Sequence, residues 1–388
     1  NFFESATFTI PIDFPDIQTA INELSELKFK EGTLIDLVLM AGHYIEEPIH
    51  LVNGDYSQFR ISSELNEVFL SPDFPKTNLL TLDNCRGPII NTIINCQGRN
   101  TMGIYVDSGS IIHINEGSGV THSGTTNLYV RGGGVAYAQG AILTHGSMDG
   151  GGDATGGSGI LAWGGFVFAE GADVSNSNTY GVQAAHGGVV SFRNGIAKDC
   201  QRYGVRSTNG GMMDLRGVVI ENAGIHGLYL FGASLVNARG ITIRNCGDAG
   251  LICLQASNVD ARDSLIEDCE RNVSVSSASR ANLGQATIRN SNGVNLTVSR
   301  GGLADAWNST ITGAGSSGVY ATNGGVAIVV ASSVTGSEGT ADLYIVDGGE
   351  INARRCRTTN STEDRPALED TNALAFNSIE NSFGLVWG

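Results

Sequence analysis

The stretch "GVRSTNGGMMDLRGVVIENAGIH", Gly204 to His226, is followed at once by "GLYLFGASLVNARGITIRNCGDA", Gly227 to Ala249, which has the same length and the same plan. The preceding block, "GVQAAHGGVVSFRNGIAKDCQRY" from Gly181 to Tyr203, also has 23 residues and follows this plan. Each block contains short stretches of alternating apolar and polar residues with turns between them. Alternation with a period of two, rich in β-branched residues, indicates strands. Three short strands and three turns fill about 23 residues, so each block predicts one coil of a parallel β-helix.

The repeat extends well beyond these three blocks. With one residue gained or lost, its first position falls on Gly159, Gly181, Gly204, Gly227, Gly250, Asn272, Asn295, Gly318 and Asp342. A period of roughly 20 to 30 residues is typical of a solenoid. Leucine-rich repeats share this length, but the regular Leu-x-x-Leu-x-Leu frame that they require is missing. The sequence therefore predicts an all-β chain built as a stack of coils.

Residues at equal block positions form columns in this prediction. One position holds isoleucines that would stack inside the coils: Ile220, Ile243, Ile266, Ile288 and Ile311. Two residues further on lies a polar ladder of turn residues, which tolerate left-handed backbone: Asp199, Asn222, Asn245, Asp268 and Asn290. Another column places Cys200, Cys246 and Cys269 among small buried side chains. The odd total of seven cysteines in buried columns favours free thiols.

The N-terminal part of the chain differs from the repeats. "PDIQTAINELSELKFKEG", Pro15 to Gly32, has apolar residues at helical spacing, with Asp16 placed to cap the start of a helix and Gly32 to close it. "SPDFPK", Ser71 to Lys76, holds two of the seven prolines and marks a boundary. We therefore expect an N-terminal α/β capping region over residues 1–75, a parallel β-helix over 76–360 and a C-terminal cap or tail over 361–388.

These features together resemble a known group, the right-handed parallel β-helix proteins of the pectin-lyase-like type, and within it phage tail spikes and tail fibres. The resemblance rests on "TIPIDFPDIQTAINELSEL" (Thr9–Leu27), on "IDLVLMAGHYIEEPI" (Ile35–Ile49) and on the coils from Gly159 to about Asn360. It implies a right-handed, single-stranded β-helix whose N-terminal mouth is closed by the helix. It also implies a homotrimer that works with other tail proteins and binds, and in many cases cuts, a polysaccharide on the surface of a host cell.

The composition narrows the possible partners. The formal net charge is −16 and the isoelectric point about 4.8, which argues against a nucleic-acid partner because binding phosphates requires a basic face. No run of about 18 apolar residues is present, so no segment is expected to span a membrane. A CxxC pair is absent, so neither a zinc ribbon nor a redox motif is supported. No cofactor or metal site is implied, although a bound calcium ion stays open.

One column of basic residues is the main candidate for glycan binding. It comprises Arg193, Arg216, Arg239 and Arg262, on four successive coils. Stacked like charges repel unless something negative lies between them. The column therefore predicts a groove for an acidic glycan, a solvated mixed-charge stripe in which Asp214 and Asp260 offset part of the repulsion, or a contact between the subunits of a trimer. A second column, Lys198, Glu221, Arg244, Glu267 and Arg289, alternates in sign and is expected to neutralise itself.

Two places offer candidate catalytic residues. Asp214 and Asp260 lie two coils apart in one column, so about 9 to 10 Å separates their backbones, a spacing that suits an inverting glycoside hydrolase. The glycine-rich "THGSMDGGGDATGGSG", Thr144 to Gly159, interrupts the register and offers His145, Asp149 and Asp153 for a lyase, whose base must titrate near neutral pH. The alternative for both is structural: surface carboxylates on a β-helix and a turn-rich loop.

Outward-facing aromatic residues, chiefly Trp163 and Tyr229, complete the set of candidate glycan-binding residues, with burial between subunits as the alternative. The sequence thus predicts a subunit of a phage tail spike or fibre that recognises a bacterial surface polysaccharide. Whether it is an enzyme stays open; if it is, it is a polysaccharide depolymerase, either a lyase or a glycoside hydrolase. The alternatives are a secreted polysaccharide enzyme with no virion role and a non-catalytic, adhesive rod. The location is the virion tail in the first case and extracellular otherwise.

Overall fold

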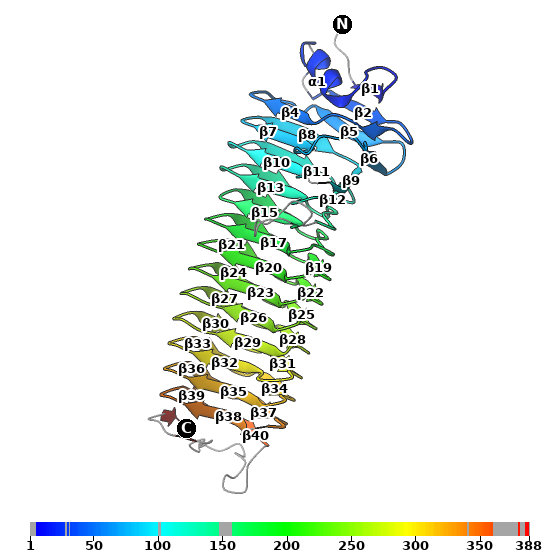
Figure 1. The fold of residues 1–388 in the computed structure, drawn as a ribbon. Helices are drawn as coiled ribbons and strands as arrows, with labels where there is room; N and C mark the ends of the chain where they lie inside the picture. Colours follow the sequence, from blue (N-terminus) through cyan, green and yellow to red (C-terminus); the bar gives the residue numbers. More distant parts are fainter. Residues whose placement is uncertain are drawn as a thin grey trace. The chain divides into compact units, whose positions relative to one another are not determined.

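A computed structural model describes residues 5–27, 29–30, 32–99, 102–146, 157–339, 341–359, 379–380 and 385–387. The chain forms two compact units, Asn1–Gln201 and Arg202–Gly388. Both consist of parallel strands wound into right-handed coils. The predicted fold class is confirmed: the chain is an all-β parallel solenoid with about 13 turns of about 23 residues each (Figure 1).

The first unit has three parallel sheets, which are built from strands of successive coils. The first sheet contains β1 (Ser5–Ile10), β2 (Leu34–Leu39), β5 (Phe59–Ser63), β8 (Arg86–Ile90), β11 (Ile111–Ile114), β14 (Val135–Tyr137), β16 (Phe166–Phe168) and β18 (Val189–Ser191). The second contains β4 (Ile49–Val52), β7 (Leu80–Asp83), β10 (Ile104–Asp107), β13 (Leu128–Arg131), β15 (Ile160–Trp163) and β17 (Tyr180–Ala185). The third contains β3 (Tyr44–Ile45), β6 (Glu67–Leu70), β9 (Ile93–Arg99) and β12 (Gly119–Ser123), and single bridges continue this side to the start of β19 (Ile196–Lys198).

The predicted helix is present as α1 (Ile17–Ser25). Asp16 caps it as expected, since its carboxylate accepts a hydrogen bond from the backbone N–H of Thr19 at 2.7 Å. The helix ends at Ser25 and not at the predicted Gly32. The hydroxyl of Ser25 donates a hydrogen bond to the backbone carbonyl of Ile21 in the last turn. The side-chain oxygen of Gln18 accepts the backbone N–H of His50 in β4, which ties α1 to the first coil. Parallel pairing already joins β1, β2 and β5, so coiling begins ahead of Ser71–Lys76.

The second unit repeats the same three-sided plan. One sheet contains β20 (Tyr203–Thr208), β23 (His226–Phe231), β26 (Ala249–Cys253), β29 (Arg271–Val275), β32 (Leu296–Ser299), β35 (Ser317–Thr322), β38 (Ala341–Val346) and β41 (Ile379–Glu380). Another contains β21 (Met212–Asp214), β24 (Leu235–Asn237), β27 (Asn258–Asp260), β30 (Arg280–Asn282), β33 (Leu303–Asp305), β36 (Val326–Ile328), β39 (Glu350–Asn352) and β42 (Leu385–Trp387). The third contains β22 (Val219–Glu221), β25 (Thr242–Arg244), β28 (Leu265–Glu267), β31 (Thr287–Arg289), β34 (Thr310–Thr312), β37 (Ser333–Thr335) and β40 (Arg357–Thr358). Of the expected C-terminal segment, residues 361–388, only β41 and β42 are among the described residues.

The predicted columns are confirmed in the register of these strands. Ile220 pairs with Ile243 and Ile243 with Ile266, and the column continues through Ile288 and Ile311, all of them fully buried. The five turn residues of the polar ladder have left-handed backbone, with φ between 54° and 57°. All seven cysteines are free and buried. In the alternating column, Arg289 forms an ion pair with Glu267 at 2.6 Å, and Arg244 forms one with Glu221.

Candidate functional site

A ladder of aromatic rings runs along the outer face of the first sheet in the first unit. His113 of β11 is paired in register with Tyr137 of β14, and Tyr137 with Phe168 of β16. The ring centroids are 4.7 and 5.3 Å apart, with planes tilted by 14° and 13°. These values describe offset stacked rings, which cover one another only in part. The ring ladder (His113, Tyr137 and Phe168) therefore presents apolar surface together with the imidazole nitrogens and the phenol oxygen.

A polar ladder lies beside the ring ladder. Two residues after each position of the ring column the chain carries a residue whose side chain can form hydrogen bonds: Asn91, Asn115, Gln139, Glu170 and Arg193. The amide of Asn115 donates to the side-chain oxygen of Asn91 at 2.6 Å. At the other end, Arg193 donates to Glu170 at 3.1 Å. Successive coils thus align three amides, a carboxylate and a guanidinium group next to the rings.

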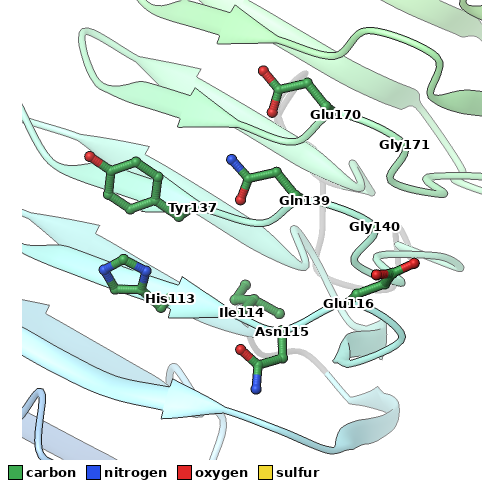
Figure 2. A pocket seen from close by; sticks show the side chains of 9 residues that line it. All are labelled: His113, Ile114, Asn115, Glu116, Tyr137, Gln139, Gly140, Glu170 and Gly171. Carbon is green, nitrogen blue, oxygen red and sulfur yellow. The ribbon is translucent and has the colours of Figure 1, made fainter.

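The two ladders border a hollow of about 420 Å³ in the surface of the first unit. Figure 2 shows the rings of His113 and Tyr137 one above the other, with the side chains of Asn115, Gln139 and Glu170 beside them. Glu116 approaches from the adjoining turn. The lining residues come from three successive coils, because β11, β14 and β16 are neighbours in the sheet. The hollow is thus both apolar and rich in hydrogen-bonding groups, as ligand sites are.

Glu170 is the best-anchored polar group of the site. Its Oε1 accepts hydrogen bonds from the hydroxyl of Ser191 at 2.5 Å and from Arg193 at 3.1 Å, while its Oε2 is buried and has no hydrogen-bond partner. Partial burial acts to raise the pKa of Glu170, but the hydrogen bonds from Ser191 and Arg193 outweigh it and hold that pKa below its usual value. The carboxylate is therefore ionised near neutral pH.

His113 differs in its electrostatics. Partial burial lowers the pKa of its imidazole, because desolvation penalises the charged form. At neutral pH the ring is therefore uncharged, and one of its nitrogens can accept a proton or a hydrogen bond.

A glycine gives the hollow its open turn. Gly140 has a φ of 63°, in the left-handed region, and a Cβ at this position would meet Cγ of Glu116 at 2.7 Å. The side chain of Glu116 lies over this turn because the glycine leaves room for it.

Of the predicted arginine column, Arg193 belongs to this site through its contact with Glu170. The other three lie in the second unit and pair with their own neighbours. Arg239 is 3.1 Å from Asp263. Arg216 forms two hydrogen bonds to Asp214, at 2.9 and 2.6 Å, and Arg262 forms the same pair with Asp260, at 2.8 and 2.6 Å. This bidentate geometry favours the mixed-charge stripe over a groove that attracts an acidic glycan.

The strand register places Asp214 and Asp260 two coils apart with Asn237 between them, as the sequence predicts. Each carboxylate, however, holds an arginine. The hydrogen bonds from Arg262 lower the pKa of Asp260 against the opposing effect of burial. Hydrolysis of a glycoside requires one carboxyl group with a raised pKa to act as the acid. The lowered pKa suits Asp260 to a structural ion pair better than to that role.

The other predicted residues lie elsewhere. His145 is exposed and stacked on His122, with ring centroids 4.3 Å apart, while Asp149 and Asp153 lie outside the described residues. Trp163 is 36% exposed at the end of β15 and stacks on His186 at 3.9 Å.

Tyr229, in the second unit, is stacked on Tyr203, with centroids 5.1 Å apart. The guanidinium of Arg206 is 6.0 Å from the Tyr229 ring, within the range of a cation–π contact. Tyr229 is therefore part of a ring cluster of its own.

The ring ladder does not follow the 23-residue repeat of the sequence. The segment between Leu143 and Gly159 lengthens one coil, so Tyr137 and Phe168 are 31 residues apart, whereas His113 and Tyr137 are 24 apart. A local motif does carry the signal. It reads "HINEG" from His113, "YAQG" from Tyr137, "FAEG" from Phe168 and "SFRNG" from Ser191. Each copy places a polar residue two positions after the ring column and a glycine soon after it.

The comparisons with known proteins agree with this fold. Residues 158–304 match the family described as the right-handed β-helix region. The Dettilon tailspike protein (gp208) is similar in structure, with a TM-score of 0.51, 13% sequence identity, and coverage of 87% of this chain and 68% of that one. The periplasmic alginate epimerase AlgG is also similar, with a TM-score of 0.52, 11% identity, and coverage of 84% and 76%. No curated protein matches the sequence. At these identities the likeness shows the fold alone.

Among the described residues, no helical segment has the length and apolar character required to cross a membrane. No group of three or more His, Cys, Asp and Glu side chains converges there in a way that could hold a metal ion.

Proposed function

We propose that this protein binds a polysaccharide along the ring ladder and the polar ladder of the first unit. The observation that carries the proposal is the alignment of the two ladders: stacked rings in one column and hydrogen-bonding groups two residues further on, coil after coil, beside one hollow. Sugars present apolar C–H faces and rims of hydroxyl groups, so a repeating glycan matches such a repeating surface. Arg193, predicted from the sequence as a glycan-binding residue, lies at one end of it.

The two structural neighbours support the same class of ligand. One is a tailspike protein and the other an epimerase of alginate, a polysaccharide. Both share the coiled scaffold with this chain, although their low identities transfer no residue roles.

More narrowly, we propose that the chain is a subunit of a phage tail spike or fibre, which acts in the virion as a homotrimer with other tail proteins. The support is the fold that it shares with the Dettilon tailspike protein. The alternative is a secreted polysaccharide enzyme, and the structural similarity to AlgG supports it. Light scattering after size exclusion distinguishes the two: a trimer of about 122 kDa from a chain of 40.6 kDa supports the spike, and a monomer supports the alternative.

Binding is tested with an array of bacterial polysaccharides, followed by titration calorimetry on the best ligand. Replacing Tyr137 by alanine removes the central ring, and we expect affinity to fall about tenfold, or ~1.4 kcal/mol. Tyr320→Ala is the matched control, because Tyr320 is also a half-buried tyrosine stacked on the next coil, at 5.3 Å from Tyr344. Equal affinities of the two variants would refute binding at the ladders.

Recognition and cleavage are separated by following products from the bound glycan. New reducing ends without ultraviolet absorbance identify a hydrolase, and both signals together identify a lyase. Binding without either signal excludes cleavage of the bound glycan and leaves recognition as the activity of the ladders.

A further inference from the structure

The arginine column of the second unit ends at Arg262. The register that pairs Asn282 of β30 with Asp305 of β33 puts Gly284 and Trp307 on the next two coils of that column. A glycine and a tryptophan thus take the places of two further arginines. The mixed-charge stripe therefore stops at these coils, and a different kind of surface begins.

Gly284 lets the indole of Trp307 lie flat on the preceding coil. A Cβ at Gly284 would be 2.6 Å from Cε2 and 2.9 Å from Cδ1 of the indole, the two atoms on either side of Nε1. Gly284 is buried and therefore lies beneath the face of the five-membered ring. Trp307 nevertheless stays 39% exposed, so the opposite face of its indole is open to solvent. An open aromatic face is a surface on which the apolar C–H face of a sugar can stack.

Two polar side chains lie beside the indole. Asp305 is half-buried and precedes Trp307 by two residues on the same outward face, and the backbone N–H of Trp307 donates to its Oδ1 at 3.4 Å. Asn282 lies next to Asp305 on the preceding coil, and its side-chain oxygen accepts the backbone N–H of Gly284 at 3.2 Å. The site thus combines an indole face with an amide and a carboxylate.

Asp305 lacks the compensation that the other aspartates of its column have. Asp260 holds Arg262, whereas Asp305 forms no ion pair with any residue that the structure describes, and its neighbour on the next coil is the apolar Ile328. Burial therefore raises the pKa of Asp305 against the weaker effect of the N–H of Trp307. Because the carboxylate is only partly buried, a hydroxyl group can reach it and donate a charge-assisted hydrogen bond.

We propose that Trp307, Asp305 and Asn282 form a second carbohydrate-binding site, which takes one pyranose of a glycan with its C–H face on the indole and its hydroxyl groups on the two polar side chains. The site goes beyond the proposed function, because it lies in the second unit and shares no residue with the ladders. A second copy of the chain fits this surface less well, since it would bury the carboxylate of Asp305 against a subunit whose net charge is −16.

The test probes an array of bacterial polysaccharides with the wild-type protein and with Trp307→Ala, and measures the affinities by titration calorimetry. For at least one polysaccharide we expect Trp307→Ala to lower the affinity about tenfold or more, because it removes the stacking surface. Leu235→Ala is the matched control. Leu235 is 51% exposed on the same sheet, three coils away, so its loss removes exposed apolar surface without touching the site.

Gly284→Ala tests the position of the indole while keeping the tryptophan. Its methyl group would collide with the ring and lift it from the coil, and the backbone of Gly284 is not left-handed, so alanine adds no backbone strain there. We expect Gly284→Ala to weaken binding of the same polysaccharide as Trp307→Ala does. Asp305→Asn keeps the shape and removes the charge of the acceptor, so it should weaken binding by a smaller factor.

The outcomes distinguish this site from the ladders. A loss with Trp307→Ala that persists in the Tyr137→Ala background supports the second site, whatever the ladders do. Equal affinities of Trp307→Ala and Leu235→Ala for every polysaccharide overturn it and leave binding at the ladders standing. Light scattering tests the other occupant: smaller oligomers of Trp307→Ala with unchanged glycan binding would assign the indole to a subunit contact. If the wild-type protein binds no polysaccharide, both proposals fall.

Discussion

The side-chain amide of Asn272 donates a hydrogen bond to the side-chain oxygen of Asn295, one coil further on, at 2.7 Å. The same amide also donates to the backbone carbonyl of Arg289 at 2.7 Å, and both asparagines are fully buried. Polar groups in such a core are tolerated only when they are hydrogen-bonded. This pair therefore couples neighbouring coils from within.

Replacing Asn272 by alanine should destabilise the protein by about 1–3 kcal/mol, because it leaves acceptors of Asn295 and Arg289 buried and without this donor. Urea unfolding measures the change. Asn258→Ala is the control: Asn258 is exposed on β27, so its substitution should alter the free energy of unfolding by less than about 0.5 kcal/mol. A loss for Asn272→Ala as small as that of the control would contradict the prediction.

We expect Asp260 to stabilise the fold through its ion pair with Arg262 and not to act in catalysis. Its pKa is lowered in the folded chain by Arg262, so folding favours the charged form. That contribution to stability is present above the unfolded pKa, near 3.8, and is lost as the pH falls through the folded value. We expect Asp260→Asn to remove this part of the acid sensitivity, as seen in thermal unfolding at a series of pH values, and to leave glycan turnover, if any, unchanged. Abolished turnover with normal stability would instead restore the predicted carboxylate pair.

His113 should titrate below its usual value of about 6.5, because burial penalises its charged form. The folded state then binds fewer protons than the unfolded state between the two pKa values, so stability rises with pH through that window and declines on acidification below about 6.5. Proton NMR of the imidazole gives the folded pKa directly. Tyr137→Ala removes a ring that covers the imidazole and should move the pKa upward. An unchanged or lower pKa in that variant would show that other groups shield it.

The sequence predicts the coils because their physical requirements repeat. Ile243 must fill the same interior space as Ile220 and Ile266, and Asn245 must adopt the same left-handed turn as Asn222, so the columns are legible in the chain. The ladders of the first unit were not predicted, since a longer coil separates Tyr137 from Phe168 and shifts them out of the repeat. For Arg216 and Arg262 the sequence left two alternatives open, a glycan groove and a mixed-charge stripe, because it places each arginine near an aspartate but does not fix the rotamers that join them.

The thiols should be inert in the native protein. Burial raises the pKa of four of them to about 12, namely Cys96, Cys200, Cys253 and Cys356. A hydrogen bond from Cys246 lowers the pKa of Cys269, but its side chain is buried as well. Because thiol reagents require an accessible thiolate, we expect negligible reaction with Ellman's reagent until denaturant is added, when all seven cysteines should react. Rapid labelling of the folded chain would show that at least one coil opens.

Substitutions at Gly140 and Gly187 separate a steric effect on Glu116 from the strain of a side chain on left-handed backbone. Gly140→Ala places a methyl group 2.7 Å from Cγ of Glu116 on left-handed backbone, whereas Gly187→Ala has the same backbone region, with φ of 76°, and nothing within 4 Å. Both substitutions should lower the free energy of unfolding by about 1–2 kcal/mol, since a side chain is strained at such φ values. Only Gly140→Ala displaces Glu116 at the edge of the hollow, so only this variant should change glycan affinity in calorimetry. Equal effects of the two variants on affinity would mean that ligand binding does not depend on the turn that carries Gly140, and would move the site away from the hollow.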